Sequence, residues 1–379
     1  MEIYPILLTF TGVALIFLVL LDAFETIVLP RRVTRRFRLT RLFYRSTWKG
    51  WSALFRSLSA GRRQETYLSF FGPLSLILLL GIWAAGLIFG FALVNWSSGL
   101  PLKAPDGATG FGTYLYLSGS TFFTLGLGDV TPLSPLSRLL TVMESGLGFG
   151  FLALVIGYLP ALNQSFSRRE VNISLLDARA GSPSTAAEML RRHSRCDGTE
   201  ALLQTLNEWE RWSAELLESH LSYPVLAYFR SQHDNQSWLA ALTTIMDTSA
   251  FVMAGMKGIC AHQAELTFAI ARHAIVDLAF VFGCPPRKTP YDRLPPAELA
   301  SVRTALAEAG LQPAEGDEVA QRLSQLRSMY EPYVFSLSHY LCLAVPPWGP
   351  EGPQRRDNWQ TSAWEQSPGR PGKPGDKHF

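Results

Sequence analysis

Three long apolar runs dominate the first 168 residues of the chain. Residues 3–21 and residues 66–96 contain no charged side chain, and a third apolar run covers residues 136–162 with a single acid, Glu144, inside it. A helix needs about 20 apolar residues to cross a hydrocarbon core of about 30 Å. The three runs therefore predict three membrane helices.

The first apolar run also has the length of a signal peptide's core. Glu2 stands where such a peptide carries basic residues, and no small-residue cleavage site precedes Pro30. We therefore expect a retained membrane helix that ends between Asp22 and Leu29.

From residue 172 onward, charged and apolar residues alternate with the period of soluble helices. The sequence Thr185-x-x-Glu188 is typical of a capping box at a helix start. One helical stripe is expected to contain Leu202, Leu206, Trp209, Ser213, Leu216 and His220. Further helices are predicted at about 236–259, 261–282, 297–309 and 316–341, separated by proline pairs and by Pro313.

Residues 264–283 are apolar enough to suggest a further membrane span. Arg272, His273 and Asp277 lie in the middle of that run, so a buried soluble helix is the better interpretation. Residues 346–379 are rich in proline, glycine and charge and predict a disordered tail.

Charge distribution gives the membrane topology. Hydrophobic residues make up 47% of the chain and charged residues 17%, and residues 31–63 contain many Lys and Arg but no Asp or Glu. Cytoplasmic loops are enriched in Lys and Arg, which places this block inside. If the uncharged residues 107–128 formed a full span, Arg168 and Arg169 would lie outside. A re-entrant loop returns them to the inside, with the N-terminus outside and the C-terminal domain cytoplasmic.

Re-entrant backbone at membrane depth is tolerated only where protein buries it or where it lines a watery path. Residues 112–123 read as a short uncharged helix, and T-L-G-L-G-D follows at residues 124–129. Glycine at every second position lets the backbone alternate between ordinary and mirror-image angles, so that successive carbonyls point one way. Such carbonyls can replace the water shell of a small monovalent cation. The Thr124 hydroxyl would add an inner oxygen ring, and Asp129 would place a carboxylate at the outer mouth.

Residues 66–162 resemble the pore module of potassium channels: an outer helix, a pore helix, a T-x-G-x-G-D filter and an inner helix. The specific part is residues 121–132. The resemblance implies that Thr124, Leu125, Gly126, Leu127 and Gly128 form the ion-binding filter. It also implies a homotetramer, because a ring needs four filters and the chain has one.

Two positions depart from the usual pattern of that family. Leu127 stands where an aromatic residue is usual, and Tyr116 and Leu117 stand where the pore helix often carries tryptophans. A Gly-Leu-Gly variant occurs in the second pore loop of two-pore-domain potassium channels. Tyr116 and Ser120 are expected to support the filter from the pore helix.

Two residues of the third apolar run are candidates for gating or filter support. By the same resemblance, Gly148 aligns with the hinge of the family's inner helix, although small residues in membrane helices also serve close packing. Glu144 is an ionisable group inside the membrane, where such groups are costly and often functional. It either faces the cavity and attracts cations or braces the filter from behind. Asp22 and Glu25 are expected to form structural pairs near Arg31 and Arg32.

In the basic segment, arginine recurs at every third residue, a spacing that is also found in voltage sensors. It is too polar to span a membrane, and only one helix precedes it. An amphipathic helix on the inner membrane surface fits better, with Arg35, Arg38, Arg41 and Arg45 touching lipids that we expect to be anionic. A solvated basic linker is the alternative.

The predicted fold is an all-α membrane protein of five segments. These are an N-terminal transmembrane helix (1–30), a basic amphipathic segment (31–65), a pore module (66–167), a helical cytoplasmic domain (168–345) and the tail (346–379). Cys196, Cys260, Cys284 and Cys342 lack metal-ligand spacing and are expected to be reduced thiols.

The leading functional hypothesis is a homotetrameric potassium channel of the cell membrane that is not voltage-sensing and is gated or assembled by its helical domain. A weakly selective cation channel and a non-conducting membrane-anchored signalling or scaffold protein are the alternatives. We expect no enzyme activity, no nucleic-acid partner and no cofactor or metal other than the permeant K⁺, because no motif for such chemistry is present. The ligand of the helical domain cannot be read from the sequence.

Overall fold

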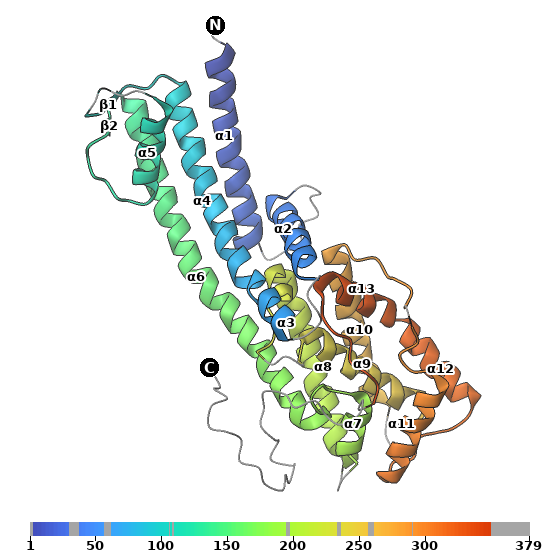
Figure 1. The fold of residues 1–379 in the computed structure, drawn as a ribbon. Helices are drawn as coiled ribbons and strands as arrows, with labels where there is room; N and C mark the ends of the chain where they lie inside the picture. Colours follow the sequence, from blue (N-terminus) through green and yellow to red (C-terminus); the bar gives the residue numbers. More distant parts are fainter. Residues whose placement is uncertain are drawn as a thin grey trace. The chain divides into compact units, whose positions relative to one another are not determined.

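The computed structural model in Figure 1 describes residues 3–29, 38–56, 62–105, 107, 110–194, 198–232, 236–256, 261–289 and 291–349. These residues are mainly helical and form two compact units. The membrane unit contains the described residues of 1–58 and 70–164, and the helical domain contains those of 59–69 and 165–379. The predicted tail lies outside the described residues from 350 onward.

The membrane unit contains the predicted apolar helices. They are α1 (Ile3–Ala23), which continues in a π-helical turn (Phe24–Val28), α4 (Phe71–Ser97) and the first part of α6 (Pro135–Ala180). Helix α1 packs against α4 where Gly12 meets Gly90. A Cβ on Gly12 would lie 2.9 Å from the carbonyl oxygen of Gly90, so these glycines allow the two backbones to approach closely.

Asp22 joins three helices of the membrane unit. Its buried carboxylate, on α1, accepts hydrogen bonds from the Trp83 indole of α4 at 3.0 Å and from the Thr40 backbone and hydroxyl. Thr40 belongs to α2 (Leu39–Arg56), the helix expected in the basic segment. Among the described residues, neutral donors hold the Asp22 carboxylate, and its expected pairing with the basic segment stays a prediction. Arg31 and Arg32 lie outside the described residues.

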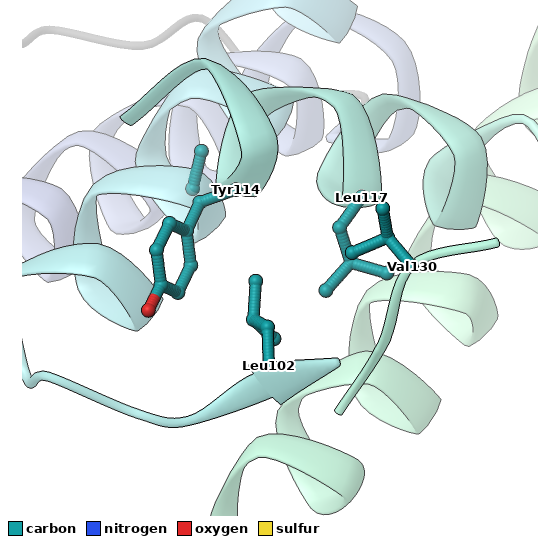
Figure 2. Close-up of a cluster of buried hydrophobic side chains, with 5 residues drawn as sticks. Leu102, Tyr114, Leu117 and Val130 are labelled. Atoms are coloured by element: carbon teal, nitrogen blue, oxygen red, sulfur yellow. The ribbon is translucent and has the colours of Figure 1, made fainter. Parts of the chain in front are cut away.

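The re-entrant segment lies between α4 and α6. Helix α5 (Phe111–Phe122) is followed by the filter, and the short strands β1 (Leu102–Lys103) and β2 (Thr131–Pro132) pair antiparallel on either side of it. Figure 2 shows side chains of α5, β1 and the filter exit converging in one buried cluster. The cluster consists of Ala92, Leu102, Tyr114, Leu117 and Val130. It fixes the pore helix to the segments that enter and leave it.

The third membrane helix is longer than expected. The predicted apolar run ends at residue 162, whereas α6 continues without a break through Pro160 to Ala180. A proline removes one backbone donor and crowds the preceding turn, but membrane helices tolerate this because neighbouring groups satisfy the freed carbonyl. Helix α6 therefore belongs to both units.

The helical domain is built around α9 (Trp238–Gly255), whose side chains are almost all buried. Helices α7, α8, α10, α12 and α13 pack against α9. The other helices of the domain are α3 (Arg62–Ser69), α7 (Ala186–Arg192), α8 (Gly198–Ser222), a 3₁₀ turn (Pro224–Tyr228), α10 (His262–Phe282), α11 (Pro296–Glu308), α12 (Asp317–Ser328) and α13 (Glu331–Leu341).

Among the described residues, four helices are long and apolar enough to cross a membrane, and α9 is one of them. Most of its apolar surface is covered by protein within the domain, as expected for a core helix. The run around Arg272 and His273 forms α10, which packs on α8 and α9. The soluble-helix interpretation of that run agrees with this packing.

The side chains of the predicted α8 stripe are all buried in the domain. At α7, the Thr185 hydroxyl caps the helix by accepting from the Glu188 backbone. The reciprocal half of the capping box is absent, because the Glu188 carboxylate binds Arg191 and Arg192 instead.

The predicted helix 316–341 is in fact two helices that break near Tyr330. Pro332 explains the break, because proline is tolerated only in the first turn of a helix.

The first four residues of the predicted tail are ordered. Residues 346–349 pack in the domain, where Trp348 is fully buried and its carbonyl accepts from the Ala187 backbone at 3.0 Å. The Pro346 carbonyl accepts from Arg293 at 2.7 Å. Composition suggested disorder, but one large aromatic anchor and these backbone bonds order the segment.

Candidate selectivity filter and its support

The filter backbone has the alternation that its glycine spacing predicts. Thr124, Gly126 and Gly128 have φ values of 56°, 57° and 78°. Every second residue therefore lies in the left-handed region, which glycine occupies at little cost and a β-branched threonine rarely adopts. Strain of this kind persists only where the surrounding structure holds it and is common at functional sites.

All six residues from Thr124 to Asp129 are exposed in the single chain, and buried Phe122 and Val130 flank them. The Leu125 and Leu127 side chains are 60% and 63% exposed. The segment is thus anchored at both ends and open along its length.

The C-terminus of the pore helix α5 carries the inner end of the filter. The Leu125 backbone donates to the Ser120 carbonyl at 2.7 Å, and the Thr124 backbone donates to the Thr121 carbonyl at 3.0 Å. Ser120, a predicted support residue, therefore contacts the filter through its backbone. The two bonds set the turn from helix to filter.

Glu144 braces α5 in this structure. It lies on α6, is 2% exposed, and its carboxyl forms a short hydrogen bond with the Ser118 hydroxyl. The same hydroxyl lies 2.7 Å from the Ile88 carbonyl of α4. Of the two interpretations that the sequence left open, this geometry agrees with the brace. The sequence pattern did not indicate a role for Ser118. It lies in an ordinary helix, and its partner Glu144 is 26 residues further along the chain.

Gly148 lies where the inner helix touches the end of the pore helix. A Cβ at this position would stand 2.0 Å from the Phe122 carbonyl oxygen. The Phe122 and Phe151 rings also pack there, with centroids 5.8 Å apart. Close packing therefore requires glycine at 148. A hinge at that position stays a prediction.

The strand pair holds the segment at the outer mouth. Tyr116 lies near Asp129, while Leu117 is buried in the cluster of Figure 2. Arg138 donates to the Pro132 carbonyl at 3.3 Å. These contacts fix the segment that leaves the filter without an aromatic residue at 127.

A polar contact that the sequence did not suggest ties the two long pore helices together. The Ser137 hydroxyl of α6 donates to the Asn95 side chain of α4 at 3.2 Å, and both residues are buried. The only available signal was two polar residues at the ends of apolar runs, which is too common to single them out.

The predicted lipid-contacting arginines differ in their surroundings. Arg38 is engaged by Glu25 at 3.6 Å and by the Thr26 hydroxyl at 3.1 Å, whereas Arg41 and Arg45 are exposed on α2. Arg35 lies outside the described residues. In the part of the chain that the structure describes, no group of three or more His, Cys, Asp and Glu side chains could hold a metal ion.

Comparison with known proteins agrees with the geometry of the pore segment. Residues 77–164 match the family model described as "Ion channel". These residues form a potassium-channel-type pore module. The match includes most of α4, the pore helix, the filter and the membrane part of α6, so the expected all-α membrane fold with this module is confirmed. The chain is a multi-pass membrane protein.

One curated relative shares a longer stretch. An uncharacterized membrane protein, YdjJ of Bacillus subtilis (strain 168), is 27% identical over 220 residues. The match covers 55% of this chain and 59% of the relative's length. No solved structure matches the chain.

Proposed function

We propose that this chain is one subunit of a homotetrameric potassium channel that conducts passively through residues 124–129. The observation that carries the proposal is the alternating backbone at Thr124, Gly126 and Gly128, between a pore helix and an inner helix. Alternation turns successive carbonyls to one side, where they can replace the hydration shell of K⁺. The C-terminus of α5 adds a partial negative charge beside the inner end of the filter.

The exposed filter supports assembly of several copies. Irregular backbone at membrane depth is not stable against lipid, and residues 124–129 are open in the single chain. Neighbouring copies would cover this segment and complete the ring of oxygens. A fourfold ring follows from the resemblance of the module to potassium channels.

Helix α2 supports a pore without a voltage sensor. It contains Arg41, Arg45 and Lys49 on an exposed face, while Tyr44 and Trp48 are buried on the opposite face. A voltage sensor carries its arginines inside an apolar span, and α2 is too polar to be one.

We also propose that α2 lies on the cytoplasmic membrane surface and touches anionic lipids. Trp48 of α2 packs on Phe71, the first residue of α4, with ring centroids 4.8 Å apart, and Thr40 binds the end of α1. The helix therefore lies level with the ends of two spans. Arg41, Arg45 and Lys49 carry this proposal, and Arg38 is excluded because Glu25 engages it. The N-terminus then lies outside and the helical domain inside.

A weakly selective cation channel is the second candidate, and Leu127 is the observation that favours it. An aliphatic residue at this position provides no hydroxyl or ring to hold the filter width. The contacts of Tyr116 and Glu144 would supply the rigidity instead. Selectivity therefore has to be measured together with conduction.

The experiment is cation flux into liposomes that contain the purified full-length chain, with K⁺, Rb⁺ and Na⁺ compared. Gly126→Ala should abolish flux, because its φ of 57° is unfavourable for alanine. Gly81→Ala is the matched control: Gly81 lies in α4 with open space around its Cβ position. Flux of K⁺ and Rb⁺ that only Gly126→Ala removes supports the channel. Equal Na⁺ flux favours the weakly selective alternative, and absence of flux from every variant favours the scaffold protein.

A further inference from the structure

Helix α3 belongs to the helical domain although the chain places it between two elements of the membrane unit. It packs with residues 165–379, and only Phe70 separates it from α4. The inner helix enters the same domain directly, because α6 is continuous from Pro135 to Ala180. Each of the two long pore helices therefore has its own attachment in the domain.

The attachment of the outer helix is an ion pair. Glu65 of α3 accepts from Arg230 at 2.9 Å, and the Arg230 side chain is 7% exposed. Arg230 also donates to the Leu341 and Cys342 carbonyls at 2.6 Å and 3.0 Å. One buried guanidinium thus links α3 to the end of α13.

The attachment of the inner helix is a second buried arginine. Arg169 of α6 is 3% exposed and donates to the carbonyls of Leu226 and Phe229, both at 2.8 Å. The Phe166 ring packs on Phe229 with centroids 5.7 Å apart. The planar guanidinium donates to the two carbonyls from two separate nitrogens in a fixed geometry, which the single nitrogen of a lysine does not reproduce.

The two attachments meet on one short segment. Arg169 binds the carbonyls of residues 226 and 229, and Arg230 is the next residue along the chain. We propose that residues 224–230 form a junction that transmits the state of the helical domain to both pore helices, with Arg169, Arg230 and Glu65 as positioning residues. This inference rests on the proposed channel function and specifies how the domain would regulate the filter-bearing unit.

A purely stabilising role would not require this arrangement. Burying a guanidinium is costly unless it is paired and hydrogen-bonded, and apolar packing often stabilises a core equally well. Here Arg230 binds α3, which leads into α4, and Arg169 lies on α6, which is itself the continuation of the inner helix. A displacement of residues 224–230 would therefore move the start of α3 and the extension of α6 together.

The test compares Glu65→Gln and Arg169→Lys with Glu208→Gln in the full-length channel. Glu208 of α8 pairs at 2.6 Å with Arg179, which lies on α6 like Arg169. The Glu208 and Arg179 side chains are 42% and 33% exposed. Loss of this ion pair should therefore change both readouts little. The first readout is amide hydrogen exchange in residues 71–80 of α4 and 150–164 of α6. The second readout is K⁺ flux and the K⁺/Na⁺ flux ratio.

We expect faster amide exchange than in the wild type in both pore segments for Glu65→Gln and Arg169→Lys. We expect an unchanged exchange rate for Glu208→Gln. We also expect a K⁺ flux change of roughly fivefold or more with an unchanged K⁺/Na⁺ ratio. Unchanged exchange in the pore segments overturns the junction, even if the domain unfolds more easily. A wild-type protein without flux whose variants show the exchange change rejects the channel proposal but supports the mechanical link.

Discussion

Thr124 has an unusual conformation for its residue type. Its φ of 56° places a β-branched side chain in the left-handed region, in phase with Gly126 and Gly128. The glycine spacing made the alternation predictable, because only glycine adopts such angles freely. The supporting contacts were not predictable, since Ser118 and Glu144 meet only after α5 and α6 have folded against each other.

The Ser118 hydroxyl has one hydrogen and two acceptors in reach, the Ile88 carbonyl and Glu144. A glutamine amide at 144 can donate the missing hydrogen. We therefore expect Glu144→Gln to retain K⁺ flux and selectivity. Glu144→Leu keeps the side-chain volume but has no polar atoms, and we expect it to lower the K⁺/Na⁺ flux ratio. A cavity-facing carboxylate would give a different pattern, with flux reduced in both variants.

Gly148→Ala should disrupt the contact between α6 and the pore helix. The new methyl group would overlap the Phe122 carbonyl, and overpacking of this kind costs about 1–3 kcal/mol or more. We expect a lower yield of folded protein and loss of flux. Gly146→Ala, with no atoms near the new methyl group, provides the control. Equal behaviour of the two variants would show that α6 does not approach Phe122 this closely.

His220 makes the helical domain sensitive to acid. Burial, and then the neighbouring Arg169, lower the pKa of His220 from 6.5 to about 3. Its Nδ1 bonds to the Leu216 carbonyl at 2.8 Å and its Nε2 faces Arg169 at 3.4 Å, so the neutral ring fits and an imidazolium would not.

The unfolded chain binds a proton at His220 below about pH 6.5, whereas the folded chain does not until about pH 3. The free energy of unfolding should therefore fall as pH decreases through this window. Urea unfolding of the full-length protein between pH 4 and pH 7, followed by tryptophan fluorescence, measures the slope. We expect a flatter slope for His220→Gln, and identical slopes would mean that His220 is not buried as a neutral ring.

At the scale of elements, helix positions were more predictable than helix ends. Uncharged runs indicated α4 and α5, and apolar periodicity indicated α8 and α10, where burial of one face determines the pattern. Two prolines affect their helices differently. Helix α6 continues through Pro160, whereas α12 and α13 are separate helices that meet near Pro332. A proline's effect depends on whether neighbours satisfy the freed carbonyl, and sequence alone does not contain that information.

A buried charge network connects α9, α13 and the segment before α11. Asp247, fully buried on α9, accepts from Arg293 at 2.6 Å and from the Tyr330 hydroxyl, and Glu331 also binds Arg293. Asp247→Asn removes the charge closest to Arg293 and leaves this buried guanidinium with Glu331 as its carboxylate partner among the described residues. We expect Asp247→Asn to lower the free energy of unfolding by about 3–5 kcal/mol.

The exposed pair of Arg179 and Glu208 provides the comparison. Glu208→Gln should change the free energy of unfolding by about 1 kcal/mol or less. Urea unfolding of the full-length variants measures both values. Similar losses for the two variants would mean that the Asp247 network is open to water.

For the whole molecule, two units share α6, and residues 77–164 match the family model described as "Ion channel". The pore module could be predicted from the sequence because its motif is local, and the multi-pass membrane character followed from run length. The domain could be predicted as helical but not as discontinuous: α3 joins it through Glu65 and Arg230, 165 residues apart. Pairing at that separation is not visible in a pattern of apolar residues.

The central claim is that residues 124–129 form a potassium-selective path. The most direct measurement is the reversal potential of the full-length channel in a planar bilayer, with K⁺ on one side and Na⁺ on the other. We predict a reversal potential far from zero in the direction set by K⁺, and no current from Gly126→Ala. Current that reverses near zero, or that Gly126→Ala leaves unchanged, would contradict the assignment.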